Sequence, residues 1–189
     1  MSSFYTRKEL QEIGFKNVGE KNQISRKSSF YSIEGSIGSN NRIDDYCVIK
    51  GNITIGSFVH VCSHSSISGV GGLIKIGDYC GIGVNNILYT CSDNMFESSF
   101  CGPLVPKEFT NTKKGDILIG TGVALGGRVT VMPNTKLGDY CAVGINGLVT
   151  SDLDECGIYA NIKNKLVKVS SKNIVTMKKI TTLINERYK

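Results

Sequence analysis

Two histidines are the residues of this chain best suited to proton transfer, because imidazole gains and loses a proton near neutral pH. They are His60 and His64, and the sequence contains no third histidine. A three-histidine zinc centre is therefore not expected, and we expect no metal. His60 closes one segment of the repeat described next, where its side chain can project outward as a general base or as a plain surface or interface residue. His64 lies among small polar residues.

Branched apolar residues recur every six residues, and this spacing defines the elements that must position the histidines. The series slips by three residues after Ile67 and stops for a longer stretch after Leu88, yet fifteen of fifteen positions are Ile, Leu or Val. A helix repeats near 3.6 residues and a strand alternates by two, so neither explains a period of six. The positions are Ile37, Ile43, Ile49, Ile55, Val61, Ile67, Ile76, Ile82, Leu88, Ile119, Leu125, Val131, Leu137, Val143 and Val149.

A short strand followed by a sharp turn does explain this period. Three six-residue sides close one triangular coil, so residues eighteen apart stack as parallel strands and the branched side chains fill the interior. Glycine directly follows eight of the fifteen positions, and we expect it to ease the backbone where the chain turns. Small residues often stand four places after the branched one, so Cys47, Cys80 and Cys141 are expected as apolar filler rather than redox or metal residues.

Three segments fall outside this period. Thr6 and Glu9 form a capping box that predicts a short helix ending near Gly14, as a lid on the first coil. Residues 89–118 lose the period over a length that in a compact domain usually indicates function. The chain's end has apolar residues at helical spacing, which predicts a helix over the last coil or a neighbouring subunit; these are Ile174, Met177, Ile180 and Ile184.

We accordingly divide the chain into a cap with a short helix over residues 1–30, a β-helix over 31–168 and a terminal helix over 169–189. Its 189 residues suit a single domain. Residues 160–189 hold eight basic residues against one acidic residue. This basic end suits a phosphate-bearing small ligand, and it lacks the interleaved aromatic residues that stack nucleic-acid bases.

The cysteine count and the hydropathy pattern predict the compartment. Seven cysteines are an odd number, and no apolar segment follows the charges near the N-terminus. The sequence also has no run of 18 apolar residues. We therefore expect a cytoplasmic protein with reduced thiols, no membrane partner and no nucleic-acid partner.

Three repeats carry a resemblance to a known family, namely Ile37-Gly38-Ser39-Asn40-Asn41-Arg42, Ile76-Gly77-Asp78-Tyr79-Cys80-Gly81 and Leu137-Gly138-Asp139-Tyr140-Cys141-Ala142. Over about residues 30–168 the chain resembles the hexapeptide-repeat acyltransferases, and most of all the galactoside, maltose and nodulation-type sugar O-acetyltransferases and those of surface polysaccharides. The resemblance implies an all-β fold, a left-handed parallel β-helix of about five triangular coils with a long loop after the third. It also implies acetyl-CoA as cosubstrate and a homotrimer with active sites between neighbouring coils.

The resemblance leaves two candidates for the base. Galactoside-type enzymes keep their catalytic histidine in the loop after the repeat that here begins at Leu88, and Asp93 occupies that place. We expect His60 to be the base, and Asp93 to be either a substitute base or the group that orients His60 or the acceptor. The two lie at different corners of the coil within one chain, so they would meet only across subunits.

The resemblance also implies two sets of binding residues. Backbone groups of the late coils would hold the pantetheine of coenzyme A, and basic side chains of the tail would hold its phosphates. The tail could instead be a solvated basic segment. The predicted residues are Gly127, Ile145, Thr150, Lys163, Lys165 and Lys168. The first coils and the long loop would hold the acceptor, with contacts from His64, Asn86 and Ser92.

These residues favour a function in acetyl transfer. We expect an acetyl-CoA-dependent acetyltransferase that acts directly on a hydroxyl or amino group of a sugar or nucleotide sugar, in the biosynthesis of bacterial surface polysaccharide of the O-antigen type. Two alternatives remain open, an N-acetyltransferase specific for nucleotide-linked amino sugars and a noncatalytic β-helix scaffold. The zinc-dependent carbonic anhydrases that share this fold are disfavoured by the missing histidine.

Overall fold

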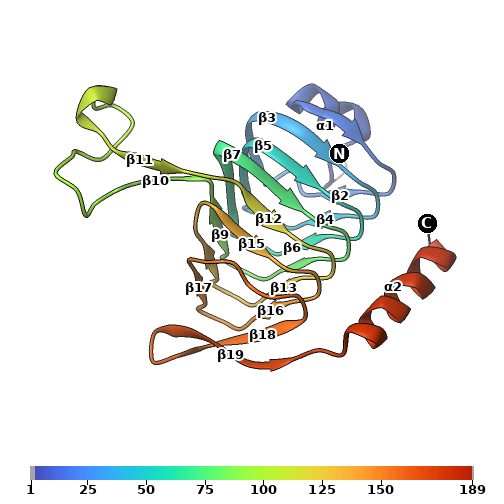
Figure 1. Cartoon of the computed structure of the whole chain (residues 1–189). Helices are drawn as coiled ribbons and strands as arrows, with labels where there is room; N and C mark the ends of the chain where they lie inside the picture. Colours follow the sequence, from blue (N-terminus) through green and yellow to red (C-terminus); the bar gives the residue numbers. More distant parts are fainter. Residues whose placement is uncertain (1–2, 189) are drawn as a thin grey trace.

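A computed structural model describes residues 3–188, and its strands stack as the coils of a parallel β-helix (Figure 1). One face is a ladder of short parallel strands. Its members are β2 (Gln23–Ile24), β4 (Arg42–Ile43), β6 (His60–Val61), β8 (Gly81–Ile82), β13 (Ala124–Leu125), β16 (Ala142–Val143) and β18 (Gly157–Ile162). The antiparallel strand β19 (Lys165–Ser171) closes this ladder. The expected parallel β-helix is therefore confirmed, and its first parallel strands, β1 (Phe15–Val18) and β2, precede the predicted start at residue 31.

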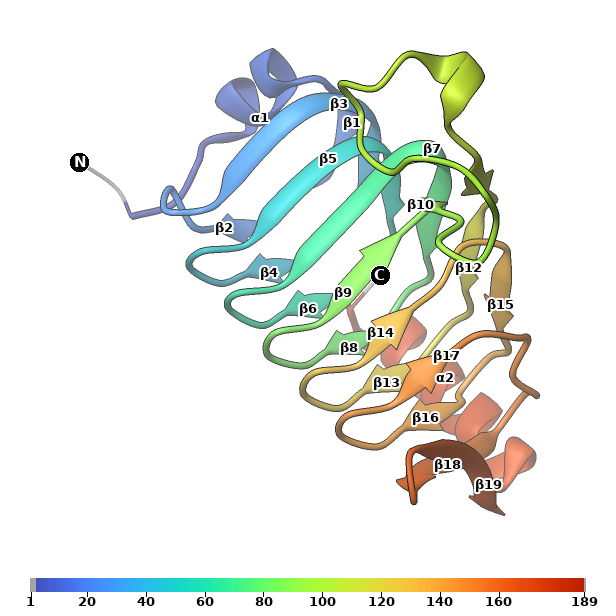
Figure 2. The same cartoon turned by 90° about the vertical axis from the view of Figure 1, so that its left-hand side faces the viewer.

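The other two faces belong to a second sheet (Figure 2). Its early strands are long and bend from one face to the next, so that one strand supplies two sides of a coil. The strands are β1 (Phe15–Val18), β3 (Ser29–Ile37), β5 (Val48–Ile55), β7 (Ser66–Ile76), β9 (Ile87–Tyr89), β12 (Ile117–Ile119), β14 (Thr130–Val131), β15 (Thr135–Leu137) and β17 (Leu148–Val149).

The six-residue period predicts the core residue by residue. All fifteen branched residues are buried, with at most 4% of their surface exposed. The register survives both interruptions, because Val61 pairs with Ile82 and Ile82 pairs with Leu125 despite the extra residues between them. The long insertion therefore leaves the coil as an arm, whereas the three-residue one is absorbed within β7 as a shift of its register with β5. Neither moves the side chains that fill the coil.

The cysteines at the fourth position behave as predicted. Cys47, Cys80 and Cys141 are buried inside the coil. Burial raises the pKa of Cys80 to about 12 and that of Cys141 to about 11. These thiols therefore stay protonated at neutral pH and are poor nucleophiles.

The glycines have a different role from the predicted one. None of the eight glycines that directly follow a core residue has a positive φ angle. A Cβ on Gly83 would instead lie 2.7 Å from the carbonyl carbon and oxygen of Gly126 in the next coil. The positive φ angles fall two residues after such glycines, at non-glycine residues such as Asn40, Tyr79 and Tyr140. These glycines allow adjacent coils to approach, and polar or aromatic residues in the left-handed region make the turns.

The short helix that the capping box predicts is present. Helix α1 (Arg7–Ile13) has the complete capping box, with the Glu9 amide donating to Thr6 Oγ1 at 3.3 Å and the Thr6 amide donating to Glu9 Oε2 at 2.7 Å. The Glu9 carboxylate accepts hydrogen bonds from the Thr6 amide, from the Thr6 hydroxyl at 2.8 Å and from Arg26, and these lower the pKa of Glu9 to about 2. Strands β1 and β2 already pair in parallel with β3 and β4. The first coil therefore starts within the segment predicted as cap, whose first two residues lie outside the described part.

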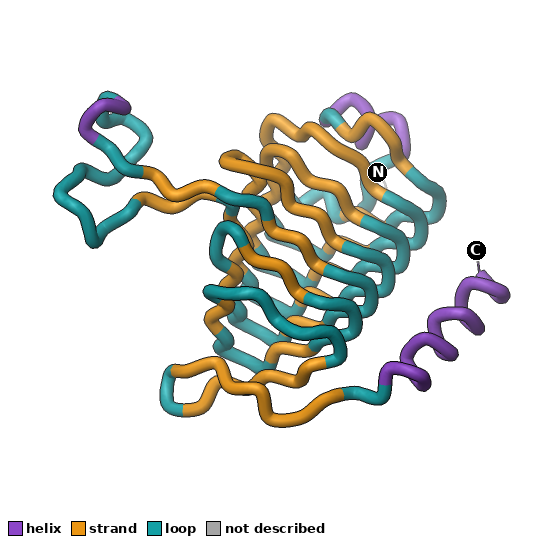
Figure 3. Tube along the Cα trace, in the orientation of Figure 1, coloured by secondary structure: helices purple, strands orange, loops and turns teal. Residues whose placement is uncertain are grey.

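Helix α2 (Ile174–Tyr188) lies along the side of the stack (Figure 3). Tyr79 donates from its hydroxyl to Asn185 Oδ1 at 2.5 Å, and the hydroxyls of Tyr140 and Thr181 are 3.2 Å apart. Both tyrosines have positive φ angles at turns of the coil, so α2 follows one corner across several coils rather than capping the last one. No described helix is long and apolar enough to span a membrane.

Candidate active site

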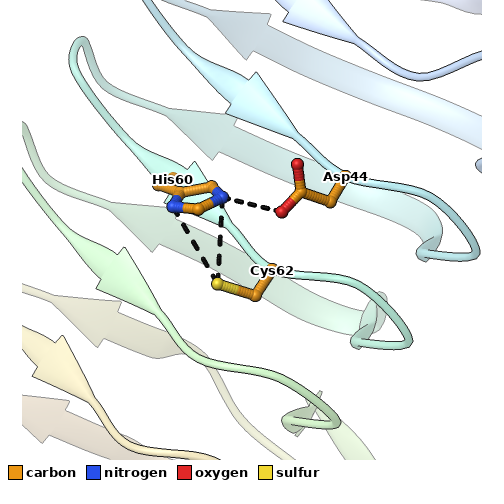
Figure 4. A group of neighbouring side chains, drawn as sticks. All are labelled: Asp44, His60 and Cys62. Carbon is orange, nitrogen blue, oxygen red and sulfur yellow. Dashed lines mark hydrogen bonds and ion pairs between the residues drawn. The ribbon is translucent and has the colours of Figure 1, made fainter.

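His60 lies on the face formed by the short strands, in a group with Asp44 and Cys62 (Figure 4). Its Nε2 atom is 2.8 Å from Asp44 Oδ2. Cys62 Sγ is 3.9 Å from Nδ1 and 3.8 Å from Nε2. The imidazole side chain is 47% exposed, whereas the Asp44 side chain is 23% exposed. The structure thus gives His60 the carboxylate partner and the outward orientation that a proton acceptor needs.

Asp44 is not among the candidates that the sequence suggests, which name Asp93 as the group that orients His60. The missed signal is the stacking register, because Arg42 and Ile43 pair with His60 and Val61 in the next coil. Asp44 directly follows this strand, just as Cys62 follows β6, so the register alone brings Asp44 beside His60.

Charge around Asp44 keeps it ionised. Burial raises the pKa of Asp44, but hydrogen bonds from Arg42 and His60 outweigh this effect, so the pKa stays below its ordinary value. The Arg42 Nε atom lies 2.6 Å from Asp44 Oδ1, which leaves the other carboxylate oxygen for His60. Burial raises the pKa of Cys62, so this thiol is not activated as a nucleophile.

Asp93 belongs to a different part of the molecule. Residues 89–118 form an arm that projects from the coil on the antiparallel pair β10 (Cys91–Asp93) and β11 (Thr112–Lys114) and carries the 3₁₀ helix η1 (Lys107–Phe109). Asp93 accepts hydrogen bonds from the Gly102 amide at 2.7 Å and from Thr112 Oγ1 at 3.0 Å. Strands β6 and β10 lie apart in both views (Figures 1 and 2). One chain therefore does not bring Asp93 to His60.

The three residues predicted to bind the acceptor also lie in different parts of the molecule. Asn86 is fully buried, and its Oδ1 atom accepts a hydrogen bond from the Val129 amide at 2.6 Å. The prediction that Asn86 binds substrate is therefore wrong, because the fourth position of the repeat points into the coil. His64 occupies a turn and stacks on Tyr46, with ring centroids 5.0 Å apart. Ser92 lies on the arm next to Asp93 and is half-buried.

Two of the residues predicted to bind coenzyme A lie on one continuous edge of the coil. Gly127 and Ile145 follow β13 and β16 at stacked corners, where the Asn146 amide donates to the Gly127 carbonyl oxygen at 3.0 Å. Ile145 is 64% exposed. Thr150 follows β17 instead, and so lies at the next corner of its coil.

The basic residues of the tail occupy a hairpin beside this edge. Lys163 and Asn164 both have positive φ angles and form the two-residue turn between β18 and β19, and Lys165 follows them. Asn161 Nδ2 donates to the Asn146 carbonyl oxygen at 2.6 Å, which fixes the hairpin against the coil. Lys168 forms an ion pair with Asp154 at 2.8 Å, so its charge is already neutralised. The exposed apolar edge and the remaining lysines fit an extended ligand with a phosphate-bearing end.

Comparisons with known proteins identify the family of the chain. The chain is 34% identical over 176 residues to dTDP-4-amino-4,6-dideoxy-D-glucose acyltransferase of Escherichia coli, covering 91% of each protein. The structure of AntD, an N-acyltransferase from Bacillus cereus in complex with dTDP and 3-hydroxybutyryl-CoA, is 31% identical over the whole of both chains, with a TM-score of 0.88.

A variant of AntD in complex with dTDP-4-amino-4,6-dideoxyglucose and coenzyme A has a TM-score of 0.87 and 30% identity, over 98% of this chain and all of that one. No family model matches the sequence. The relatives of known activity nevertheless match along almost the entire chain and share the stacked coils. The protein therefore belongs to the hexapeptide-repeat acyltransferases of the left-handed β-helix fold, enzymes that act on sugars.

Proposed function

We propose that this enzyme transfers an acyl group from a coenzyme A thioester to the amino group of a dTDP-linked amino sugar. One observation carries this proposal: a relative that is 34% identical over 91% of both chains is named for that acceptor. The AntD complexes support it, because they pair dTDP or the dTDP-linked amino sugar with coenzyme A or its thioester. The acceptor is thereby narrowed from the sugar hydroxyl or amine expected from sequence to a nucleotide-linked amine.

The proposed chemistry is a direct transfer. The neutral amine of the sugar attacks the thioester carbonyl carbon, the carbon–sulfur bond breaks, and coenzyme A leaves as its thiol. The nitrogen must lose one proton, which a general base accepts. We assign this role to His60, which has the carboxylate of Asp44 at 2.8 Å and an exposed ring. Asp93 remains the alternative base, and it can reach a site at His60 only from another chain.

The donor is proposed to lie along the edge that includes Gly127 and Ile145. We assign the exposed Ile145 side chain to apolar contact with the pantetheine. We assign Lys163 and Lys165, in the hairpin that follows, to the phosphates. Lys168 is given a smaller role in this proposal, because Asp154 already pairs with its ammonium group. Acetyl-CoA is the predicted donor, and 3-hydroxybutyryl-CoA is a second donor to test, since AntD was solved with it.

The product indicates the next reaction class. A nucleotide-linked sugar is an activated glycosyl donor, so a glycosyltransferase must consume the acylated product, which agrees with the predicted role in surface polysaccharide. We also propose that the enzyme is a cytoplasmic homotrimer with sites between chains. Strand β6, which carries His60, lies apart from β10, which carries Asp93, within one chain, and this supports the assembly (Figures 1 and 2).

Release of free coenzyme A tests the proposed function. The assay compares dTDP-4-amino-4,6-dideoxyglucose with the matched dTDP sugar that carries a 4-hydroxyl group, using acetyl-CoA and 3-hydroxybutyryl-CoA as donors. We expect turnover with the amine and a product heavier by one acyl group in mass spectrometry. Turnover with the hydroxyl sugar alone would overturn the choice of an amine, and no turnover with any nucleotide-linked sugar would overturn the acceptor class.

Substitution of the two candidate bases tests the assignment of roles. We expect His60→Ala to abolish turnover while acetyl-CoA binding, measured by calorimetry, persists. Near-normal turnover of His60→Ala together with loss of turnover in Asp93→Asn would move the base to Asp93.

A further inference from the structure

The group formed by Asp44, His60 and Cys62 contains the donor types of a transition-metal site. One donor atom from each residue lies within 4.8 Å of the other two. Counting histidines in the sequence could not reveal this set, because it combines one imidazole, one thiol and one carboxylate from two adjacent coils. We propose that Asp44 Oδ2, a ring nitrogen of His60 and Cys62 Sγ bind Zn²⁺, with water completing the coordination.

Two of the three donor–donor distances are close to those of tetrahedral zinc. Zinc bonds of about 2.0–2.1 Å to nitrogen and oxygen and about 2.3 Å to sulfur place two donors roughly 3.3–3.6 Å apart. Asp44 Oδ2 and His60 Nε2 are 2.8 Å apart and would open by about half an ångström, whereas Cys62 Sγ and His60 Nε2 are 3.8 Å apart and would close slightly. The third pair, an Asp44 carboxylate oxygen and Cys62 Sγ, lies within 4.8 Å, and rotation of these partly exposed side chains would bring both atoms to the metal.

The donor types decide which ion the site prefers. Arg42 holds Asp44 Oδ1 at 2.6 Å, so this carboxylate has a fixed orientation and presents only one oxygen to a metal. One sulfur and one nitrogen select zinc or cobalt over magnesium and calcium, which prefer several oxygen ligands. When zinc binds, Cys62 loses its thiol proton to solvent and the zinc–sulfur bond forms, with no change of oxidation state.

The site also has a consequence for catalysis, which rests on the proposed function. A ring nitrogen that binds zinc cannot accept a proton from the acceptor amine. For each protein we compare the turnover rate with zinc to the rate with a chelator. We expect zinc to lower this rate by a larger factor in the wild-type enzyme than in Cys62→Ser. Equal factors alongside intact zinc binding would overturn this consequence and the role of His60 as base, but not the metal site.

Binding is tested on the full-length enzyme without donor or acceptor. Cys91 and Cys101 are the other cysteines that are not buried, so both are replaced by serine to leave Cys62 as the accessible thiol. In this background we expect one Zn²⁺ per chain by calorimetry, and Co²⁺ should give a sulfur-to-metal charge-transfer band with visible tetrahedral bands. Mg²⁺ should not bind.

Two variants in this background attribute the signal to the site. Cys62→Ser should remove the charge-transfer band and weaken zinc binding on the order of 100-fold, more than loss of a typical outer partner. His64→Ala is the matched control, since His64 stacks on Tyr46 and does not belong to the group, and it should retain both signals. Circular dichroism checks the fold of each variant. Absence of stoichiometric zinc binding in the background protein, or binding that survives Cys62→Ser, would overturn the proposal.

Discussion

Replacing Gly83 with alanine should destabilise the coil, whereas the same change at Gly81 should not. The two glycines flank the core residue Ile82 in one repeat, and neither has a positive φ angle. A Cβ at Gly83 would lie 2.7 Å from both the carbonyl carbon and the oxygen of Gly126, which are backbone atoms that cannot rotate away. A Cβ at Gly81 would have no atom within 4 Å. Comparing the two variants therefore tests whether glycine is needed at position 83 for close approach of adjacent coils or for formation of the turn.

The expected magnitudes follow from these distances. Overpacking of this kind costs about 1–3 kcal/mol, so we expect Gly83→Ala to lower the free energy of unfolding by about 2 kcal/mol. Gly81→Ala should raise it by about 0.5 kcal/mol, because alanine restricts the unfolded chain at a compatible backbone conformation. For a chain of this size the difference corresponds to roughly 5–10 °C in Tm.

Differential scanning calorimetry of the two variants and the wild type measures this difference. The runs share one protein concentration, since self-association makes Tm concentration-dependent. Our reasoning is refuted if the two variants melt within a degree of each other, or if Gly83→Ala is the more stable one. Either outcome would mean that the coils separate at no cost, and that glycine is needed there for another reason.

Three further predictions concern the site and the coil interior. If each site combines His60 of one chain with Asp93 of the next, mixed trimers of inactive His60→Ala and Asp93→Asn chains should regain activity. Co-expression in equal amounts should restore about one quarter of the sites, measured as coenzyme A release. No recovery would show that the two residues do not act across chains. Replacing Lys163 and Lys165 together by alanine should raise the KM for acetyl-CoA roughly tenfold but leave that for 3′-dephospho-coenzyme A thioester nearly unchanged, and equal effects on both donors would argue against a 3′-phosphate contact. Asn86→Ala should lower the free energy of unfolding in urea by about 1–3 kcal/mol, because the buried backbone amide of Val129 loses its acceptor. An unaltered urea midpoint would contradict the role of that hydrogen bond.

The sequence alone determined the parallel β-helix and its core. Fifteen branched residues at a period of six are all buried, because the period itself specifies which side chain points inward on every side of every coil. The capping box at Thr6 and the loss of period after Leu88 were equally local signals, and a helix and a projecting arm stand there. Patterns of this kind are readable because their physical cause lies within a few neighbouring residues.

The site depended on the tertiary structure, because its partners come from different coils. Asp44 meets His60 and Cys62 only through the pairing of β4 with β6, and Asn86 turned out to be an interior residue whose polar side chain bonds the next coil. Asp93 lies on an arm whose direction no local pattern specifies. The period fixes which residues face outward, but only the stacking of coils, separated by insertions of different length, decides which outward residues become neighbours.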